Sequence, residues 1–445
     1  MFRKHIFFSQ TITIALFFAA LVIGGCSSSQ TTEQAQVEKQ ELDDTLSLIT
    51  KKELDLNPRP SMRSSLLFDK SSSMRGYLES SGDPSFYGAI SSVSILAHVN
   101  DCHFFGEEEE PAIDRETFND LLNKRSIKWS TESNIKSMIG SMINHINKGD
   151  DICLLVTDGI LSGSNEEIST SPDRDYNRTH REELSHNIAA LFEKESGKIS
   201  ALIIRYEANF KTSPTIKQGG WYYYCYNNDK KIINNQKRPF FIIAIGKWEN
   251  IKYLQENLIN AESGMVSTSY KDIALLGENF DIYDNIKLSY SEGIKTEPKN
   301  PNLLIIKSEY RKDGMASLTA DISDLPHYMQ SKEYMDNNVE LTIRHGQKSA
   351  KPLAKEYWDV SVNTVNGKSI LRLSIKASQL IDSRLSYKLN YSLPKWIETK
   401  SDDDDLDITD NPLKMGKTFN LKYLIAGFEA LQKNKTILEQ TLEFK

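Results

Sequence analysis

The most informative part of this chain is the stretch Leu66-Leu67-Phe68-Asp69-Lys70-Ser71-Ser72-Ser73. An apolar run, typical of a buried strand, ends in a carboxylate, and two hydroxyls follow at alternate positions, Ser71 and Ser73. Oxygen donors of this kind suit hard cations such as Mg²⁺ or Mn²⁺, whereas zinc sites favour sulfur and imidazole. A single loop cannot complete an octahedron, so further ligands must come from other parts of the chain.

Two later stretches can supply such ligands. Thr131-Glu132-Ser133 comes just before an amphipathic segment, and Thr157-Asp158-Gly159 follows the apolar run Ile152 to Val156. In a doubly wound parallel sheet, loops that follow strands gather at the carboxyl ends of the strands, where ligands bind. We therefore expect the three stretches to meet at one edge of a sheet. A Ser or Asp after a strand often only caps a turn, so the prediction depends on all three together.

The order Asp-x-Ser-x-Ser, then Thr, then Asp in Thr-Asp-Gly resembles the metal-ion-dependent adhesion site of the von Willebrand factor type A family, over roughly residues 60–290. The resemblance implies direct coordination by the Ser71 and Ser73 hydroxyls, with Asp69 and Asp158 binding directly or through water. Thr131 would be a direct ligand when the site is engaged. Its flanks, Trp129-Ser130 and Glu132-Ser133, depart from the small residues usual there, so Ser133 stays open as the alternative ligand.

The resemblance implies a binding protein rather than an enzyme, in which an Asp or Glu of a protein partner fills the last position on the cation. Two other functions stay open: a metal-dependent phosphoester hydrolase, and a structural scaffold that holds no metal. No His-Glu-x-x-His or Gly-x-Ser-x-Gly motif occurs, and no lysine matches a phosphate-binding loop. Structural roles are expected for five histidines: His98, His103, His145, His327 and His345.

The first residues indicate export and lipidation. Arg3-Lys4 precedes an apolar stretch from Ile12 to Ile23, and Ile23-Gly24-Gly25-Cys26 resembles a bacterial lipobox, whose cysteine carries the acyl chains. We expect a signal peptide at 1–25 and a lipid-anchored, flexible tether at 26–58, where the polar composition disfavours a packed core. Serine after Cys26 implies sorting to the outer membrane of the cell envelope. An uncleaved transmembrane helix is the alternative, but the apolar core is short for a span.

Composition excludes some classes of partner and of site. The formal net charge is −7 with both signs interspersed, so no basic surface for nucleic acid is expected. Besides Cys26, the cysteines are Cys102, Cys153 and Cys225, an odd set without zinc-type spacing. Cys153 lies in a predicted strand and should be an inert buried thiol, whereas a Cys102–Cys225 disulfide stays open.

Hydrophobic periodicity divides the remainder into two predicted domains. Residues 59–295 alternate strands with helices at 85–98, 133–146, 179–195 and 248–258, which predicts an α/β domain with a doubly wound, mostly parallel sheet of von Willebrand type A or Rossmann-like type. The alternation breaks near 207–238, where Trp221-Tyr222-Tyr223-Tyr224 suggests a hairpin insertion. The strand at 240–245 is expected to resume the sheet.

Residues 296–445 change to a period of two, as in 339–343, 358–362, 371–375 and 385–391. This predicts an antiparallel β-sandwich-like domain with a terminal helix at 421–431. Two acidic runs, Glu107 to Glu110 and Asp402 to Asp407, are expected to be solvated loops, although Ca²⁺ binding at the second is the alternative.

Overall fold

The computed structural model describes most of the chain after residue 61. The described residues are 62–79, 84–130, 133–160, 174–195, 197–213, 221–225, 229–261, 270–277, 286–432 and 435–445. The expected signal peptide, Cys26 and the tether lie outside these residues, so those predictions stay untested.

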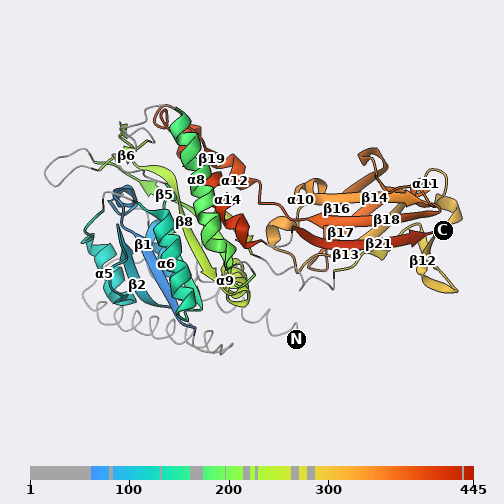
Figure 1. Cartoon of the computed structure of the whole chain (residues 1–445), viewed down its shortest axis with the longest axis horizontal. Coiled ribbons are helices and arrows are strands. Elements are labelled where there is room, and N and C mark those ends of the chain that lie inside the picture. Colours follow the sequence, from blue (N-terminus) through green and yellow to red (C-terminus); the bar gives the residue numbers. More distant parts are fainter. Residues whose placement is uncertain are drawn as a thin grey trace, which may run out of the picture. The chain divides into compact units, whose positions relative to one another are not determined.

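A seven-stranded mixed sheet forms the first part of the described chain (Figure 1). Its strands lie in the order β3 (Ile113–Asp114), β2 (Val99–Phe105), β1 (Ser64–Asp69), β4 (Ile152–Thr157), β8 (Gln236–Gly246), β5 (Ser200–Phe210) and β9 (Asp272–Leu276). The central strand β1 pairs in parallel with β2 and with β4. The carboxyl ends of these three strands therefore lie at one edge, as the sequence predicted.

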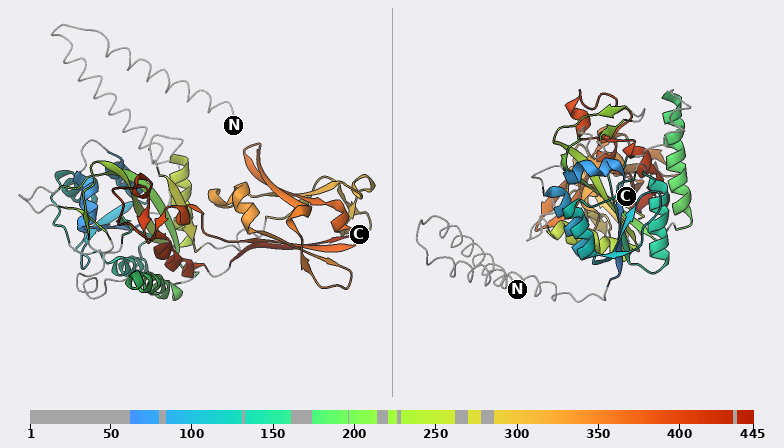
Figure 2. Two further views of the ribbon diagram at one scale, coloured as in Figure 1. Left: turned by 90° about the horizontal axis from the view of Figure 1, so that it is seen from above. Right: turned by 90° about the vertical axis from the view of Figure 1, so that its left-hand side faces the viewer.

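Both faces of this sheet are covered by helices, because its strands are apolar on both sides. In β1, Leu66 and Phe68 belong to one apolar cluster and Leu67 to the other. The first cluster includes side chains of α3 (Arg75–Glu79), α4 (Ser85–Leu96), α5 (Arg115–Lys124) and α9 (Trp248–Ala261). The second includes side chains of α6 (Ile135–Asn147), α8 (Arg174–Glu193) and α14 (Leu421–Phe428), which lie on one side of the sheet in Figure 2. The prediction of an α/β layer structure is thus confirmed.

The strand near 240–245 differs from the expectation, because β8 runs antiparallel to both of its neighbours. It pairs with β5 along its whole length, from Ser200 opposite Gly246 to Phe210 opposite Gln236. Two adjacent antiparallel strands can be joined directly by a hairpin, whereas parallel strands need a crossover. The segment between them, with the short strands β6 (Tyr223–Tyr224) and β7 (Lys230–Lys231), therefore belongs to the connection of a long β5–β8 hairpin.

Two helices begin at residues other than those expected. Helix α6 is capped by Asn134, whose side chain accepts a hydrogen bond from the Ser137 amide, so Ser133 is not its cap. The Ser133 hydroxyl instead donates a hydrogen bond to Asp69. Helix α8 begins at Arg174 rather than at Thr179, so the capping-box pattern lies inside the helix.

The β-rich part contains two sheets that share one apolar cluster. The strands of the four-stranded sheet lie in the order β10 (Ser289–Tyr290), β13 (Met315–Asp321), β17 (Lys368–Lys376) and β16 (Trp358–Val365). The strands of the six-stranded sheet lie in the order β11 (Ile294–Glu297), β12 (Asn300–Ile306), β21 (Thr436–Phe444), β18 (Ser383–Asn390), β14 (Val339–His345) and β15 (Lys351–Pro352). Every pair is antiparallel except β12 with β21. Helix α10 (Lys332–Asn338) packs its buried Met335 into the same cluster.

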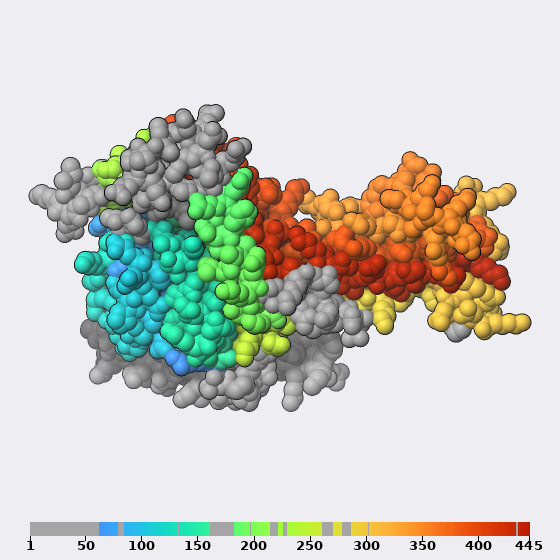
Figure 3. Space-filling view, in the orientation of Figure 1, coloured from blue at the N-terminus to red at the C-terminus, as the bar shows by residue number. Residues whose placement is uncertain are grey.

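The chain between β18 and β21 packs into the α/β core, which corrects the expected division at residue 296. This segment contains α12 (Trp396–Thr399), β19 (Ser401–Asp402), α13 (Pro412–Met415), β20 (Thr418–Phe419) and α14. Phe428 of α14 lies against Phe192 of α8, with ring centroids 4.8 Å apart. A β-carbon at Gly427 would fall 2.6 Å from the β-carbon of Ile188, so the two helices approach closely. Figure 3 shows α8 in green against the red C-terminal segment.

Candidate functional site

Two buried carboxylates, Asp69 and Asp158, lie at the carboxyl edge of the central sheet. Asp69 is the last residue of β1, and Asp158 follows the last residue of β4, its parallel neighbour. Asp69 is 0% exposed and Asp158 is 2% exposed. Parallel pairing of two strands, each ending in an apolar run, is what brings the two acidic residues together.

The orientation of Asp69 is fixed by three hydrogen bonds from three different loops. Its Oδ1 accepts from the Ser71 amide at 2.9 Å, and its Oδ2 accepts from the Ser133 hydroxyl at 3.0 Å and the Thr157 hydroxyl at 2.9 Å. A carboxylate can accept about four hydrogen bonds. The Ser71 hydroxyl also hydrogen-bonds the carboxylate, so protein donors occupy most of its acceptor positions, and a cation would displace one of them or bind through water.

The hydroxyls of Ser71 and Ser73 continue from Asp69 towards Asp158. Their Oγ atoms are 3.0 Å apart, and Ser73 is hydrogen-bonded to the Asp158 carboxyl group. Asp158 Oδ1 also accepts from the Ile160 amide at 3.0 Å. The structure therefore brings together four of the five predicted ligands, Asp69, Ser71, Ser73 and Asp158.

Burial of two adjacent carboxyl groups makes their ionisation unfavourable. Burial, followed by the charge of Asp69, raises the pKa of Asp158 to about 6. Burial also raises the pKa of Asp69, although the hydrogen bonds from Ser71, Thr157 and Ser133 oppose that rise. A divalent cation between the two would relieve both the desolvation and the mutual repulsion.

The second loop lies beside the first, but its predicted ligand is not described. Thr131 falls outside the described residues, as does Glu132. Just before them, Ser130 forms two backbone hydrogen bonds with the first loop. Its amide donates to Lys70 O at 2.8 Å, and its carbonyl oxygen accepts from Ser72 N at 2.9 Å. Ser133 donates to Asp69, whereas Thr131 is not among the described residues, so the choice between the two as the ligand from this loop stays open.

Sequence reasoning missed two residues of this cluster. Thr157 is fully buried and holds Asp69, and its position in Thr-Asp-Gly was the signal that could have identified it. Arg238, near the start of β8, is 1% exposed, and its positive charge counteracts the rise in the pKa of Asp158. No local pattern marks Arg238, because the hairpin that brings it to this edge depends on long-range pairing.

The oxygen donors fit a hard cation. Magnesium–oxygen distances of about 2.0–2.1 Å place neighbouring ligands of an octahedron about 2.9 Å apart. The Ser71 and Ser73 oxygens are separated by 3.0 Å, so they can occupy adjacent positions without rearrangement. Thr157 and Ser133, which hydrogen-bond Asp69, would then act as outer partners that orient a ligand.

The second acidic run is partly buried, which corrects the expectation of a solvated loop. Asp405 is 2% exposed and accepts a hydrogen bond from the Tyr223 hydroxyl at 2.8 Å. The guanidinium of Arg238 lies 4.6 Å from the centre of the Tyr223 ring. Lys414 and Lys422 form ion pairs with neighbouring carboxylates of the run. Its charges are therefore compensated by protein groups, which disfavours the alternative of Ca²⁺ binding.

The three described cysteines, Cys102, Cys153 and Cys225, are buried free thiols, so the Cys102–Cys225 disulfide is not formed. Burial raises the pKa of Cys102 and of Cys225 to about 12 and that of Cys153 well above its usual value. All three are therefore unreactive at neutral pH, as expected for Cys153.

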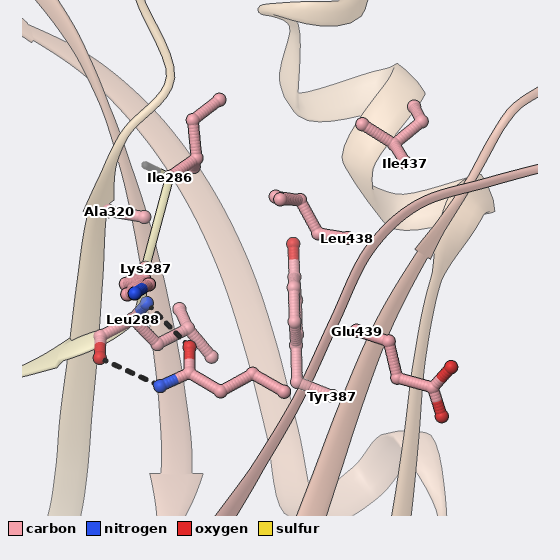
Figure 4. Close-up of a pocket in the computed structure, with 9 residues that line it drawn as sticks. Ile286, Lys287, Leu288, Ala320, Tyr387, Ile437, Leu438 and Glu439 are labelled. Atoms are coloured by element: carbon pink, nitrogen blue, oxygen red, sulfur yellow. Dashed lines mark hydrogen bonds between the residues drawn. The ribbon is translucent and has the colours of Figure 1, made fainter. Parts of the chain in front are cut away.

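A separate cavity of about 470 Å³ opens in the β-rich part (Figure 4). Its wall exposes polar and apolar groups in similar measure, and the Gln440 side chain in this wall hydrogen-bonds the backbone N–H and C=O of Leu288. The Tyr387 hydroxyl, buried at this wall, has no hydrogen-bond partner among the described residues. The cavity lacks a convergent set of charged or nucleophilic groups, so the Asp69 cluster is the better candidate site.

No protein-family model, curated protein sequence or solved structure matches this chain. Among the described residues, no helix combines the length and the apolar character needed to cross a bilayer. The geometry of the site is therefore the main ground for a functional argument.

Proposed function

We propose that this chain is a membrane-anchored lipoprotein that binds a protein partner through a divalent cation held at the Asp69 cluster. The observation that carries the proposal is the convergence of Asp69, Ser71, Ser73 and Asp158 at the edge where β1 and β4 end. The spacing of these residues resembles that of the von Willebrand type A site, which supports the same proposal. The sheet differs from the expectation in being mixed rather than mostly parallel.

The chemistry of the cluster favours binding over catalysis. Ser71 and Ser73 would coordinate Mg²⁺ or Mn²⁺ directly, while Asp69 and Asp158 would neutralise most of its charge. A carboxylate from an Asp or Glu of the partner would complete the coordination. The described residues around Asp69 include no histidine or lysine hydrogen-bonded to Ser71 or Ser73 that would activate a nucleophile.

Two further parts of the proposal concern location. The lipobox-like Cys26 would carry acyl chains, including palmitate, that anchor the protein in a bacterial cell envelope, and Ser27 favours the outer membrane. The polar segment 26–58 would separate the anchor from the folded part.

Arg238 supports a second candidate, a scaffold that holds no metal. Its buried positive charge lies close enough to Asp158 to stabilise the ionised carboxylate, which is part of what a cation would do. The hydrogen bonds that Asp69 already accepts from Ser71, Ser133 and Thr157 point the same way, because they occupy most of its acceptor positions.

Calorimetric titration of the full chain with Mg²⁺ and Mn²⁺ separates the two candidates. We expect saturable binding that is lost in Asp69→Asn and in Asp158→Asn and retained in Asp313→Asn, which changes an exposed carboxylate of the β-rich part. Circular dichroism would establish that each variant is folded. Absence of binding at millimolar metal would favour the scaffold, and capture of a partner that is insensitive to chelator would count against cation-dependent recognition.

A further inference from the structure

A second polar cluster lies on the face of the sheet covered by α6, at the end of that helix opposite Ser133. His103 on β2, Glu109 in the turn after β2 and His145 in the last turn of α6 bring three donor atoms within 4.8 Å of one another. His103 Nδ1 lies 2.9 Å, and His145 Nε2 3.0 Å, from the same oxygen, Oε1 of Glu109. Three side chains from three segments thus converge on one point.

Local structure explains why these side chains meet. An antiparallel bridge between Phe105 and Glu109 turns the chain back along β2, which places Glu109 beside His103. Ser141 and His145 are four residues apart and so share one face of α6. The Ser141 hydroxyl donates to Glu109 Oε2, which leaves Oε1 directed at the two imidazole rings.

A buried carboxylate orients the His145 ring from its other side. Asp150 Oδ2 lies 3.0 Å from His145 Nδ1, and the Asp150 side chain is 3% exposed. Asp150 is itself held by the Ser65 hydroxyl and by Arg63 Nε at 3.1 Å. With Nδ1–H donated to Asp150, Nε2 is the ring nitrogen directed at Glu109, and it becomes a ligand when an ion replaces its hydrogen bond to that carboxylate. A carboxylate that accepts from the second ring nitrogen is the usual outer partner of a metal-binding histidine.

We infer that His103, Glu109 and His145 form a binding site for a zinc-class divalent cation, with Asp150 as the residue that positions His145. Two imidazoles and one carboxylate are a recognised zinc ligand set, and bond lengths of about 2.0–2.2 Å place tetrahedral ligands about 3.3 Å apart. The two separations from Glu109 Oε1, 2.9 and 3.0 Å, lie within a few tenths of an ångström of that value, and the two imidazole nitrogens lie within 4.8 Å of each other.

Ion binding requires both ring nitrogens that hydrogen-bond Glu109 to give up their protons, and it leaves one position open. His103 Nδ1 also lies 3.0 Å from the carbonyl oxygen of Glu110, so in the metal-free protein this nitrogen carries a proton. Coordination through Nδ1 would release that proton to solvent. The Glu109 side chain is 27% exposed, so an ion can enter from solvent and water can occupy the fourth position.

The two candidate sites take different ions, so this inference does not depend on the proposed function. The Asp69 cluster offers oxygen alone and suits hard cations, whereas the imidazoles of His103 and His145 suit zinc, cobalt and related ions. Loss of Mg²⁺ binding would therefore leave the zinc-class site untouched.

Cobalt titration of the metal-free full chain, followed by visible absorption, tests the inference. We expect about one equivalent to give the intense d–d bands of four-coordinate cobalt, and zinc to displace it. His145→Gln and Glu109→Gln should weaken binding at least tenfold, and Asp150→Asn about 10- to 100-fold. His345→Gln, at the end of β14 in the β-rich part, is the matched control and should bind as the wild type does.

Two observations would overturn the inference: six-coordinate spectra in the wild type, or equal affinity in His145→Gln and the wild type. Repeating the titration in an Asp69→Ala background, where the bands should persist, removes any contribution from the Asp69 cluster. A measurement on the wild type alone guards against misfolded variants: zinc should protect His103 and His145, but not His345, from acylation by diethyl pyrocarbonate. Equal labelling with and without zinc would contradict the site.

Discussion

The Thr157 hydroxyl donates a 2.9 Å hydrogen bond to Oδ2 of Asp69, which joins the ends of two parallel strands through side chains. The same hydroxyl accepts from the Gly159 amide at 3.1 Å, so it also shapes the turn that carries Asp158. One side chain therefore orients both carboxylates of the candidate cation site.

Thr157→Val should weaken Mg²⁺ binding about 10- to 100-fold, because Asp69 loses an orienting donor while the volume at the site is kept. Thr157→Ser restores the hydroxyl and should recover most of the affinity. Isothermal calorimetry measures both, with unfolding curves as a check on stability. Equal affinity in Thr157→Val and the wild type would show that Asp69 is oriented without Thr157.

The metal-free protein should lose stability as the pH rises from about 4 to about 6. The pKa of Asp158 is raised from 3.8 to about 6 in the folded state, so between these values the native form binds more protons than the unfolded form. The free energy of unfolding therefore falls with rising pH, by roughly 3 kcal/mol for a shift of about two units. Urea unfolding in the presence of chelator measures this slope. Asp158→Asn should flatten it, and an unchanged slope in that variant would assign the effect to other groups.

Asp405→Ala should destabilise the protein by about 2–4 kcal/mol, because it leaves the buried Tyr223 hydroxyl without its acceptor and removes a negative charge near Arg238. Asp410→Ala changes an exposed carboxylate of the same segment and should stay within about 0.5 kcal/mol of the wild type. Denaturant unfolding compares the two. Similar small losses in both would indicate that the acidic run is solvated after all.

Phe428→Ala should cost about 3–5 kcal/mol, because the ring is fully buried against Phe192 and its removal leaves a cavity. Leu413→Ala, at a residue 80% exposed, is the matched truncation and should be nearly neutral. Thermal unfolding monitored by circular dichroism gives both values. If the two variants melted together, α14 would not be part of the α/β core.

Strands and helices with strong local signals were predictable from the sequence. The apolar run before Asp69 became β1, the run from Ile152 became β4, and the one-sided stripe from Ile135 became α6. The Asp69 cluster was predictable for the same reason, since parallel strands bring their ends together. The alternating segments after residue 338 likewise became antiparallel strands.

Features set by long-range pairing were not predictable. The direction of β8 depends on whether the segment after β5 turns back as a hairpin or crosses over, and the composition of that segment permits both. Helix α14 shows an apolar face in the sequence, but the sequence does not say which surface covers that face. The meeting of His103, Glu109 and His145 requires the turn after β2 and the end of α6 to be adjacent, which no spacing indicates.

The return of α14 to the α/β core has a consequence for the order in which the chain folds during synthesis. Residues 393–432 complete the α/β core, and β21, which follows them, completes the six-stranded sheet. Neither core can close over its last apolar face until this final stretch has emerged from the ribosome. Until then, the uncovered side chains of α8 and β18 are surfaces for a chaperone to shield, and contacts between distant segments make folding slow.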